Sequence, residues 1–306
     1  MNSSVTILGC QSATPRVNSH TTSQVLLMKN RHFLIDCGEG TQVQLRKYKF
    51  SFAKFNHIFI SHLHGDHFFG LIGLLSTFAL HGREKTLHIY APKGLEEVIN
   101  LQFEVTQSKS RATFTIEFHE LSSAKSELIF EDKKVEVYTI PLKHRIYTNG
   151  FLFKEKTEER TLNIDAVRKY PEIEVCDYHN IKKGKDFVRE DLSIIENSIL
   201  TFDPPKPKSY AFCSDTSYLP SIVDIVKNVD LLYHESTFLE DRKDMTIKTG
   251  HSTAKEAATI AKMANAKKLI LGHFSSRYFN LDTFKSEAQE VFENVIVAND
   301  GLNVRL

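Results

Sequence analysis

An apolar run leads directly into a cluster of potential metal ligands in residues 58–67, Ile58-Phe59-Ile60-Ser61-His62-Leu63-His64-Gly65-Asp66-His67. His62 and His64 are two residues apart, so in extended backbone both imidazoles project from one side. Gly65 permits a sharp turn, which can carry Asp66 and His67 to a second position beside the first. The spacing predicts one loop that holds two cations. Its nitrogen and oxygen donors suit Zn²⁺ and also Mn²⁺.

A structural zinc site is the main alternative for this loop. Structural zinc sites usually close with four ligands and favour cysteine. No cysteine lies near residues 58–67, and the carboxylate of Asp66 is typical of an open, hydrolytic site. We therefore expect a catalytic metal centre.

The overall composition is that of an ordinary globular protein. The chain has 306 residues, of which 41% are hydrophobic and 25% are charged, enough for one large domain or two. Its formal net charge is only +1, so a nucleic-acid partner would have to meet a local basic patch.

Cysteine usage and hydropathy indicate the compartment. The four cysteines are scattered without a C-x-x-C pair, which fits a reducing cytosol. The first residues lack the pattern of a secretory leader, and no run approaches the roughly 20 apolar residues of a membrane span. We expect a cytoplasmic protein without a membrane partner.

Strands and helices alternate along most of the chain. The predicted strands 134–140, 209–213 and 268–272 each lead into a possible metal ligand, in order His144, Asp215 and His273. Ligands collect at strand ends in layered α/β proteins. We therefore predict two sheets inside and helices outside.

Two helices are predicted beside these strand ends. Residues 68–81 form a mostly apolar helix whose first turn would lie beside the metals. Residues 253–264 form an alanine-rich helix, with Ser252 or Thr253 as its N-cap.

Three motifs carry a resemblance to a known family. Residues 62–67 match the H-x-H-x-D-H motif of the metallo-β-lactamase superfamily of hydrolases. Two further segments resemble signature segments of the ribonuclease Z family: residues 36–42 (Asp-Cys-Gly-Glu-Gly-Thr-Gln) and 274–278 (Phe-Ser-Ser-Arg-Tyr). The resemblance to this family extends over nearly the whole chain. The resemblance implies an α/β fold, namely a metallo-β-lactamase-like four-layer αβ/βα sandwich. It also implies a single metallo-hydrolase domain over residues 1–306, from which an inserted arm protrudes.

The inserted arm is expected in residues 154–195, where charge runs replace long apolar runs. By resemblance this arm is a candidate tRNA-binding exosite, and the alternative is a solvated surface insertion. Ile181-Lys182-Lys183-Gly184 is similar to the end of the family's arm, whereas the Gly-Pro segment expected before it is absent. Its geometry is therefore expected to depart from the family's.

The resemblance also implies the ligand set of two Zn²⁺ ions per chain, with Mn²⁺ as an alternative. His62, His64 and His144 would hold the first ion, and Asp66, His67 and His273 the second. Asp215 would bridge both ions through its two carboxylate oxygens. Seven side chains from separate segments would then converge on one centre.

Catalysis needs proton transfers that the remaining side chains can supply. Asp66 would orient the attacking water and accept its proton. His251 would protonate the leaving group, and Glu235 would orient its imidazole and keep it protonated. The alternative is that His251 is a residue at the start of a helix without a catalytic role. Residues expected to bind substrate are Ser275, Arg277, Lys182, Lys183 and Lys185. Histidines to which we assign no function are His20, His32, His57, His81, His88, His119 and His179.

The implied activity is that of a zinc-dependent endoribonuclease acting on precursor tRNA. It would remove the 3′ trailer and leave a 3′-hydroxyl on the tRNA and a 5′-phosphate on the trailer. The resemblance also implies a homodimer. Two alternatives remain open, a phosphodiesterase of the same fold acting on small diesters and a non-catalytic RNA-binding protein with a structural metal.

Overall fold

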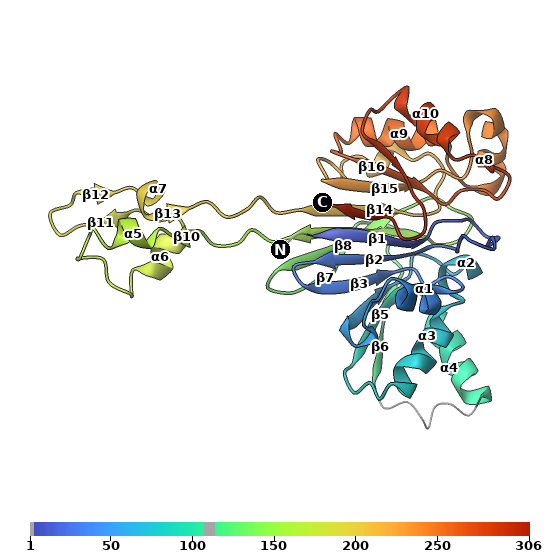
Figure 1. Cartoon of the computed structure of the whole chain (residues 1–306), viewed down its shortest axis with the longest axis horizontal. Helices are drawn as coiled ribbons and strands as arrows, with labels where there is room; N and C mark the ends of the chain where they lie inside the picture. Colours follow the sequence, from blue (N-terminus) through green and yellow to red (C-terminus); the bar gives the residue numbers. More distant parts are fainter. Residues whose placement is uncertain (1–2, 107–113) are drawn as a thin grey trace. The chain divides into compact units, whose positions relative to one another are not determined.

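The computed structural model describes residues 3–106 and 114–306. The chain forms two compact units, one made of residues 1–154 and 208–306 and the other of residues 155–207 (Figure 1). Within the described residues of the first unit, the strands form two seven-stranded sheets.

The first sheet has the order β18-β1-β2-β3-β4-β5-β6. Its strands are β18 (Asn303–Arg305), β1 (Ser4–Gly9), β2 (Ser23–Met28), β3 (Arg31–Ile35), β4 (Phe55–Phe59), β5 (Leu87–Pro92) and β6 (Ile116–Leu121). The second sheet has the order β17-β16-β15-β14-β9-β8-β7. Its strands are β17 (Val295–Val297), β16 (Leu269–Gly272), β15 (Leu231–Glu235), β14 (Ser209–Cys213), β9 (Asn149–Glu155), β8 (Val135–Pro141) and β7 (Leu128–Glu131).

Helices cover the outer faces of the two sheets, which gives the layer order helix, sheet, sheet, helix (Figure 1). The helices of the first unit are α1 (Thr41–Lys47), α2 (Gly65–Phe68), α3 (Leu71–Leu80), α4 (Leu95–Val105), α8 (Lys243–Thr249), α9 (Ala254–Met263) and α10 (Asp282–Gln289). Short 3-10 helices span Phe52–Lys54, Pro220–Ile222 and Glu240–Arg242. The predicted αβ/βα sandwich is confirmed.

Aromatic rings fill the space between the two sheets. Phe59 of β4 stacks on Tyr90 of β5 at 4.7 Å between ring centroids, and it meets Phe151 and Phe153 of β9 edge-on at 5.3 Å each. These rings are almost entirely buried. Large apolar area removed from water, together with edge-to-face geometry, stabilises the pairing of the sheets. The sheets therefore meet at a fixed spacing, which fixes the strand ends that carry the site.

The parallel strands β3, β4 and β5 are apolar and buried toward their carboxyl ends, where both of their faces are covered. On the other sheet, β14, β15, β16 and β17 are also parallel to one another. Parallel strands bring their carboxyl ends to one edge of a sheet, and both sheets present those ends to the loops described below.

Helix α9 begins where the sequence placed it. Thr253 is the N-cap, and its hydroxyl accepts a hydrogen bond from the Glu256 amide while the Glu256 carboxylate accepts one from the Thr253 amide. This capping box satisfies two amides that the first helical turn leaves without partners. Of the two predicted caps, Thr253 is the one observed.

The predicted helix 68–81 is observed as α3, which begins only at Leu71, and Phe68 instead ends the preceding helix α2. Gly70 separates them, and its amide donates to the Cys37 carbonyl at 2.9 Å. A Cβ atom at Gly70 would lie 2.1 Å from the Gly38 carbonyl oxygen. The glycine therefore lets the chain pack against the turn after β3, and this contact ends the first helix early.

The second unit has a small core of its own. Buried side chains in it are Val167, Ile173, Ile181, Ile195 and Leu200. Its elements are β10 (Thr161–Leu162), α5 (Ile164–Val167), α6 (Tyr178–Lys182), β11 (Phe187–Val188), β12 (Ile194–Ile195), α7 (Asn197–Leu200) and β13 (Thr201–Phe202). It contains nearly all of the predicted insertion 154–195 and continues to Pro207.

No helix within residues 3–106 and 114–306 is long and apolar enough to cross a membrane.

Candidate metal centre and active site

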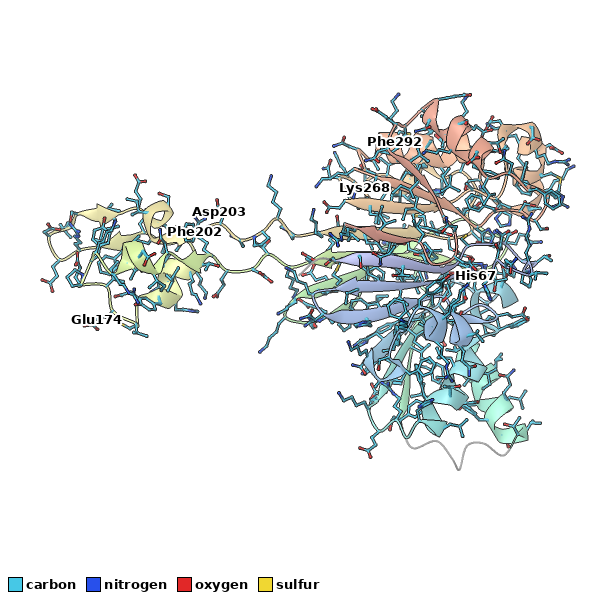
Figure 2. All side chains as sticks on the ribbon, viewed as in Figure 1. His67, Glu174, Phe202, Asp203, Lys268 and Phe292 are labelled. Atoms are coloured by element: carbon cyan, nitrogen blue, oxygen red, sulfur yellow. The ribbon has the colours of Figure 1, made fainter. Side chains whose placement is uncertain are left out.

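The loops after four strands bring together seven side chains that could bind metal. The segment after β4 supplies His62, His64, Asp66 and His67, and the segments after β8, β14 and β16 supply His144, Asp215 and His273. His67 lies where the strands of both large sheets end (Figure 2). His273 has a left-handed backbone with a φ of 60°. Non-glycine residues adopt such backbone mainly where the surrounding structure enforces it, often at functional sites.

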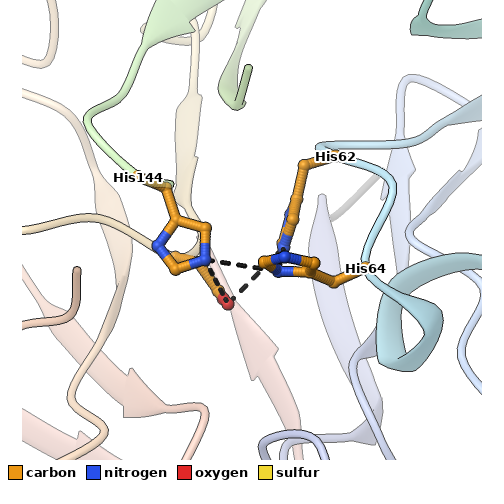
Figure 3. A group of neighbouring side chains, drawn as sticks. His62, His64 and His144 are labelled. Carbon is orange, nitrogen blue, oxygen red and sulfur yellow. Dashed lines mark hydrogen bonds and ion pairs between the residues drawn. The ribbon is translucent and has the colours of Figure 1, made fainter. Parts of the chain in front are cut away.

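The first ligand group consists of His62, His64, His144 and Asp215. His64 Nδ1 lies 3.1 Å from His62 Nε2 and 3.3 Å from His144 Nε2. Asp215 Oδ2 lies 3.5 Å from His62 Nε2 and 3.9 Å from His144 Nε2. Figure 3 shows the imidazoles of His62, His64 and His144 turned toward one another.

The second ligand group consists of Asp66, His67 and His273. Asp66 Oδ2 lies 3.4 Å from the Nε2 atoms of both His67 and His273. The other carboxylate oxygen of Asp215, Oδ1, lies 3.4 Å from His67 Nε2 and 3.1 Å from His273 Nε2. Asp215 therefore faces the first group with one oxygen and the second group with the other.

The donor spacing fits two tetrahedral ions. Ligand atoms about 2.0–2.1 Å from a central ion are roughly 3.3 Å from one another in a tetrahedron. The two groups show separations of 3.1–3.9 Å. His67 Nε2 is also buried without a hydrogen-bond partner. A buried imidazole nitrogen without a hydrogen-bond partner is unfavourable, and a cation bound between His67, Asp66 and Asp215 would be its partner.

The second ring nitrogen of each buried ligand is held by the protein. Asp36 Oδ2 lies 2.7 Å from His67 Nδ1, and Asp36 also accepts hydrogen bonds from the amide and hydroxyl of Ser61. The Gly250 carbonyl accepts from His144 Nδ1 at 2.8 Å. The Thr237 hydroxyl lies 2.9 Å from His273 Nδ1. Such partners fix each ring's orientation and leave the other nitrogen free to bind metal.

Opposite charges balance one another inside the centre. Burial alone would raise the pKa of Asp215, but the imidazoles of His273, His67 and His62 outweigh it and hold that pKa well below its usual value. Burial lowers the pKa of His62, and the neighbouring His67 lowers it further, so the His62 imidazole stays neutral. Ionised carboxylates and neutral imidazoles are the forms that bind metal. Burial alone would lower the pKa of His67, but the carboxylates of Asp66, Asp215 and Asp36 raise it well above its usual value, so a bound cation would replace the proton of this ring.

His251 and Glu235 form a pair beside the ligands. His251 Nδ1 lies 2.9 Å from Glu235 Oε1, and the ring of His251 lies 5.0 Å from that of His144 and 5.3 Å from that of His273. Glu235 is fully buried and also accepts from the amides of Ser252, Thr216 and Thr237. Burial alone would lower the pKa of His251, but the carboxylate outweighs it and raises that pKa to about 9.

A pocket of about 470 Å³ opens over the centre. It is lined by His64, Asp66, Asp215, His251 and His273 of the centre. Its walls include Glu39, Phe69, Arg145, Ser275 and Arg277. The pocket thus combines metal ligands, a histidine with a raised pKa and two arginines, which is a suitable environment for a phosphate ester.

Comparison with proteins of similar sequence identifies the family of this chain. A ribonuclease Z of Porphyromonas gingivalis is 46% identical over 303 residues, covering 99% of this chain and 99% of the relative. The chain belongs to the ribonuclease Z family. It is therefore an endoribonuclease, a phosphodiester hydrolase, as the sequence motifs predicted.

Solved structures agree with membership of the ribonuclease Z family. Human tRNase Z, short form, is 28% identical with a TM-score of 0.71, and the match covers 98% of each chain. The metallo-β-lactamase fold protein YhfI of Bacillus subtilis is 21% identical with a TM-score of 0.69 and full coverage of both chains, which supports the fold alone.

A family model described as Anti-Pycsar protein Apyc1 matches residues 3–173, and the chain belongs to that family as well. Residues 3–173 contain His62, His64, Asp66, His67 and His144. The ribonuclease Z relative extends further and also spans Asp215 and His273.

The structure of this ribonuclease Z family member brings most of the predicted site residues together. All seven predicted ligands lie in the two groups, and Glu235 and His251 lie beside them. Arg277 is exposed at the pocket wall, and Ser275 is buried there with its hydroxyl 3.4 Å from the Arg277 guanidinium. Lys182, Lys183 and Lys185 lie in the second unit, at and just after the end of α6.

Other residues of this ribonuclease Z site escaped sequence reasoning. Asp36 and Thr237 hold the imidazoles of His67 and His273, and Arg145 lines the pocket. Asp36 carried one usable signal, because it is an acidic residue directly after a buried strand. Nothing in the local sequence distinguishes Thr237 from any other threonine.

Replacing Asp36 with asparagine is expected to weaken metal binding by the ribonuclease Z centre by about 10- to 100-fold. The amide would no longer hold His67 with a charged acceptor, so the ring loses its fixed orientation. Competition with a chromophoric zinc chelator measures this affinity. Asp300→Asn is the matched control, because Asp300 pairs with His20 at 2.7 Å and lies outside both ligand groups. Equal metal affinity in wild type and Asp36→Asn would contradict the assigned role.

Proposed function

We propose that this protein removes the 3′ trailer from precursor tRNA with two Zn²⁺ ions held by the two ligand groups. The cut leaves a 3′-hydroxyl on the tRNA and a 5′-phosphate on the trailer. The observation that carries the proposal is the position of Asp215, whose two carboxylate oxygens face separate groups of ligands at the floor of a pocket. Similarity to the ribonuclease Z of Porphyromonas gingivalis and to the structure of human tRNase Z supports precursor tRNA as the substrate.

The first ion is assigned to His62, His64 and His144, the second to Asp66, His67 and His273, and Asp215 to both. Mn²⁺ is the alternative, because imidazole and carboxylate donors accept either metal. When bound, such ions make a water molecule nucleophilic at neutral pH and neutralise charge on the phosphate.

Protein side chains move the protons in this proposal. Asp66 borders the pocket and accepts the proton of the attacking water. The carboxylate of Glu235 keeps the His251 imidazole protonated, and His251 donates this proton to the 3′ oxygen that leaves from phosphorus. Glu235 is a positioning residue, since its five hydrogen bonds fix the carboxylate beneath the ring.

Substrate phosphates are assigned to basic side chains in both units. Arg277, with Ser275 beside it, forms part of the pocket wall, and a guanidinium binds phosphate oxygens through paired hydrogen bonds. Lys183 and Lys185 are exposed in the second unit, and Lys182 is half-buried. We assign this unit, the inserted arm, to binding tRNA away from the cut.

Removal of the second unit tests the arm's role. Strands β9 and β14 are paired antiparallel, with Lys154 opposite Ser209, so a short glycine-containing turn can replace residues 155–207. We expect this variant to lose cleavage of a 3′-extended tRNA and to keep hydrolysis of a small model phosphodiester. Both rates are measured by initial velocities with zinc present. A variant that cuts the extended tRNA at the wild-type rate would rule out docking by this unit.

A triple substitution gives a finer version of the same test. Lys182, Lys183 and Lys185 are changed together to alanine, with Lys248, exposed on α8, changed as the control. Removing one lysine that binds a phosphate lowers the slope of log affinity against log salt by about one. The triple variant is therefore expected to bind tRNA more weakly and with less salt dependence.

The proposal includes a cytoplasmic homodimer, in which the arm of one subunit holds tRNA for the other. All four cysteines are free, which fits a reducing compartment. Light scattering on the purified protein tests the dimer, and a monomeric mass at micromolar concentration would exclude it.

A further inference from the structure

Three side chains with metal-binding atoms meet at the edge of the first sheet, outside the centre described above. His88 lies on β5, and Glu117 and His119 lie on the edge strand β6. The parallel register places His88 opposite Glu117. Glu117 and His119 are two residues apart and so project from one face of the sheet. Sequence reasoning assigned neither histidine a function.

The donor atoms of this edge cluster are close together. His88 Nδ1 lies 3.1 Å from His119 Nε2 and 3.2 Å from Glu117 Oε2. These separations match the spacing of about 3.3 Å between the ligands of a tetrahedral ion. They also match the separations within the two groups of the active site. The edge cluster shares no residue with those groups.

Neighbouring rings hold both imidazoles in place. His119 stacks on Tyr90 at 4.3 Å between centroids with 10° between the ring planes. His88 stacks on His57 at 5.0 Å with 13° between the planes. Tyr90 in turn stacks on the buried Phe59. Ring orientations supported in this way need little reorganisation to bind an ion, so less affinity is lost on ordering.

Charge and exposure also suit a bound cation. Burial lowers the pKa of His119, and the neighbouring His88 lowers it further, which keeps a lone pair available at neutral pH. The side chains of His88 and Glu117 are 29% and 52% exposed, so an ion can enter from solvent and keep water as its remaining ligand. Glu117 places a carboxylate beside the two imidazoles.

We propose that His88, Glu117 and His119 form a third metal site, which takes one divalent transition-metal ion of the Zn²⁺, Ni²⁺ or Cu²⁺ class. The ion joins the edge strand β6 to β5. An edge strand has one row of backbone groups without a strand partner, and a metal cross-link to its neighbour reduces fraying and pairing with other chains. The site is independent of the nuclease activity.

Metal stoichiometry tests the proposal. The purified protein is titrated with Zn²⁺, and bound ions are counted by native mass spectrometry. Wild type is expected to bind three ions per chain, and Glu117→Ala and His119→Ala two, with affinity at the edge cluster reduced by about 100-fold or more. Glu117 is exposed, so its removal leaves the fold intact. The third ion is also expected to raise the melting temperature of wild type and of neither variant.

Two controls separate this site from other histidines. His64→Ala removes a ligand of the active site, so it should lose an ion there and keep the one at the edge cluster. His179 is exposed in the second unit and belongs to none of the ligand groups, so His179→Ala should bind three ions. A third ion that persists in Glu117→Ala, or that is lost in His179→Ala, would overturn the proposal. Equal numbers of bound ions in wild type and His119→Ala would also overturn it.

Discussion

Replacing Asp215 with asparagine is expected to lower tRNA cleavage by about a thousand-fold or more. The reason is the double role of this side chain. Its Oδ2 faces His62 and its Oδ1 faces His273, so replacing one oxygen by an amide nitrogen removes a donor from one group and ends the bridge between them. The variant also loses the negative charge that lies among several imidazoles. Initial rates on a 3′-extended tRNA and zinc content per chain measure the effect.

The matched control for this prediction is Asp230→Asn. Asp230 is also buried, but it binds Lys267 and Ser209 at the start of β15 and lies outside both ligand groups. It should cost stability and keep the full zinc content. His144→Ala removes a donor from the first group alone, so it should retain more zinc than the Asp215 variant. An Asp215→Asn protein with wild-type zinc content and rate would refute the bridging role.

Replacing His251 with alanine is expected to lower the rate of tRNA cleavage by about 10²- to 10⁴-fold with unchanged zinc content. His251 lies against the ligand rings and is held by Glu235. Its donor atom lies within 4.8 Å of those of Asp215 and His273, but His251 is assigned to neither of the two proposed ligand sets. Its loss therefore removes a proton donor and leaves every assigned ligand in place. The effect should fall on kcat and much less on KM, because the proton is needed in the transition state.

A change of leaving group distinguishes proton donation from a structural role. The 3′ oxygen of a ribose is a poor leaving group and needs a proton, whereas a nitrophenolate leaves without one. Hydrolysis of bis(p-nitrophenyl) phosphate should therefore be nearly the same in wild type and His251→Ala. In Asp215→Asn both activities should disappear. A His251→Ala protein in which both activities fall equally would show that His251 supports the centre and does not donate the proton.

The first half of the metal centre could be predicted from consecutive residues. His62, His64, Asp66 and His67 occupy six positions after an apolar strand, so local backbone geometry alone brings them near one another. His144, Asp215 and His273 are far away in sequence. Their strand-end positions indicated a common edge, but the family resemblance was needed to join them into one centre.

The residues that support the ligands were not predictable in this way. Asp36 and Thr237 act through single hydrogen bonds to His67 and His273, and those bonds depend on how β3, β4, β15 and β16 lie in the two sheets. The late start of the predicted helix 68–81, at Leu71, has a similar cause. Gly70 and Gly38 approach closely across the fold, and local helix propensity does not include that approach.

The sequence by itself determined the alternation of strands and helices and the donor chemistry of residues 62–67, because periodicity and close spacing are local properties of the chain. The family resemblance of its motifs added the four-layer fold. Tertiary structure alone decided which oxygen of Asp215 faces which group, which partners orient the imidazoles, and that His88, Glu117 and His119 meet at a sheet edge. Each of these depends on distances between segments that are remote in sequence. Such distances are set by the packing of the two sheets and by strand register.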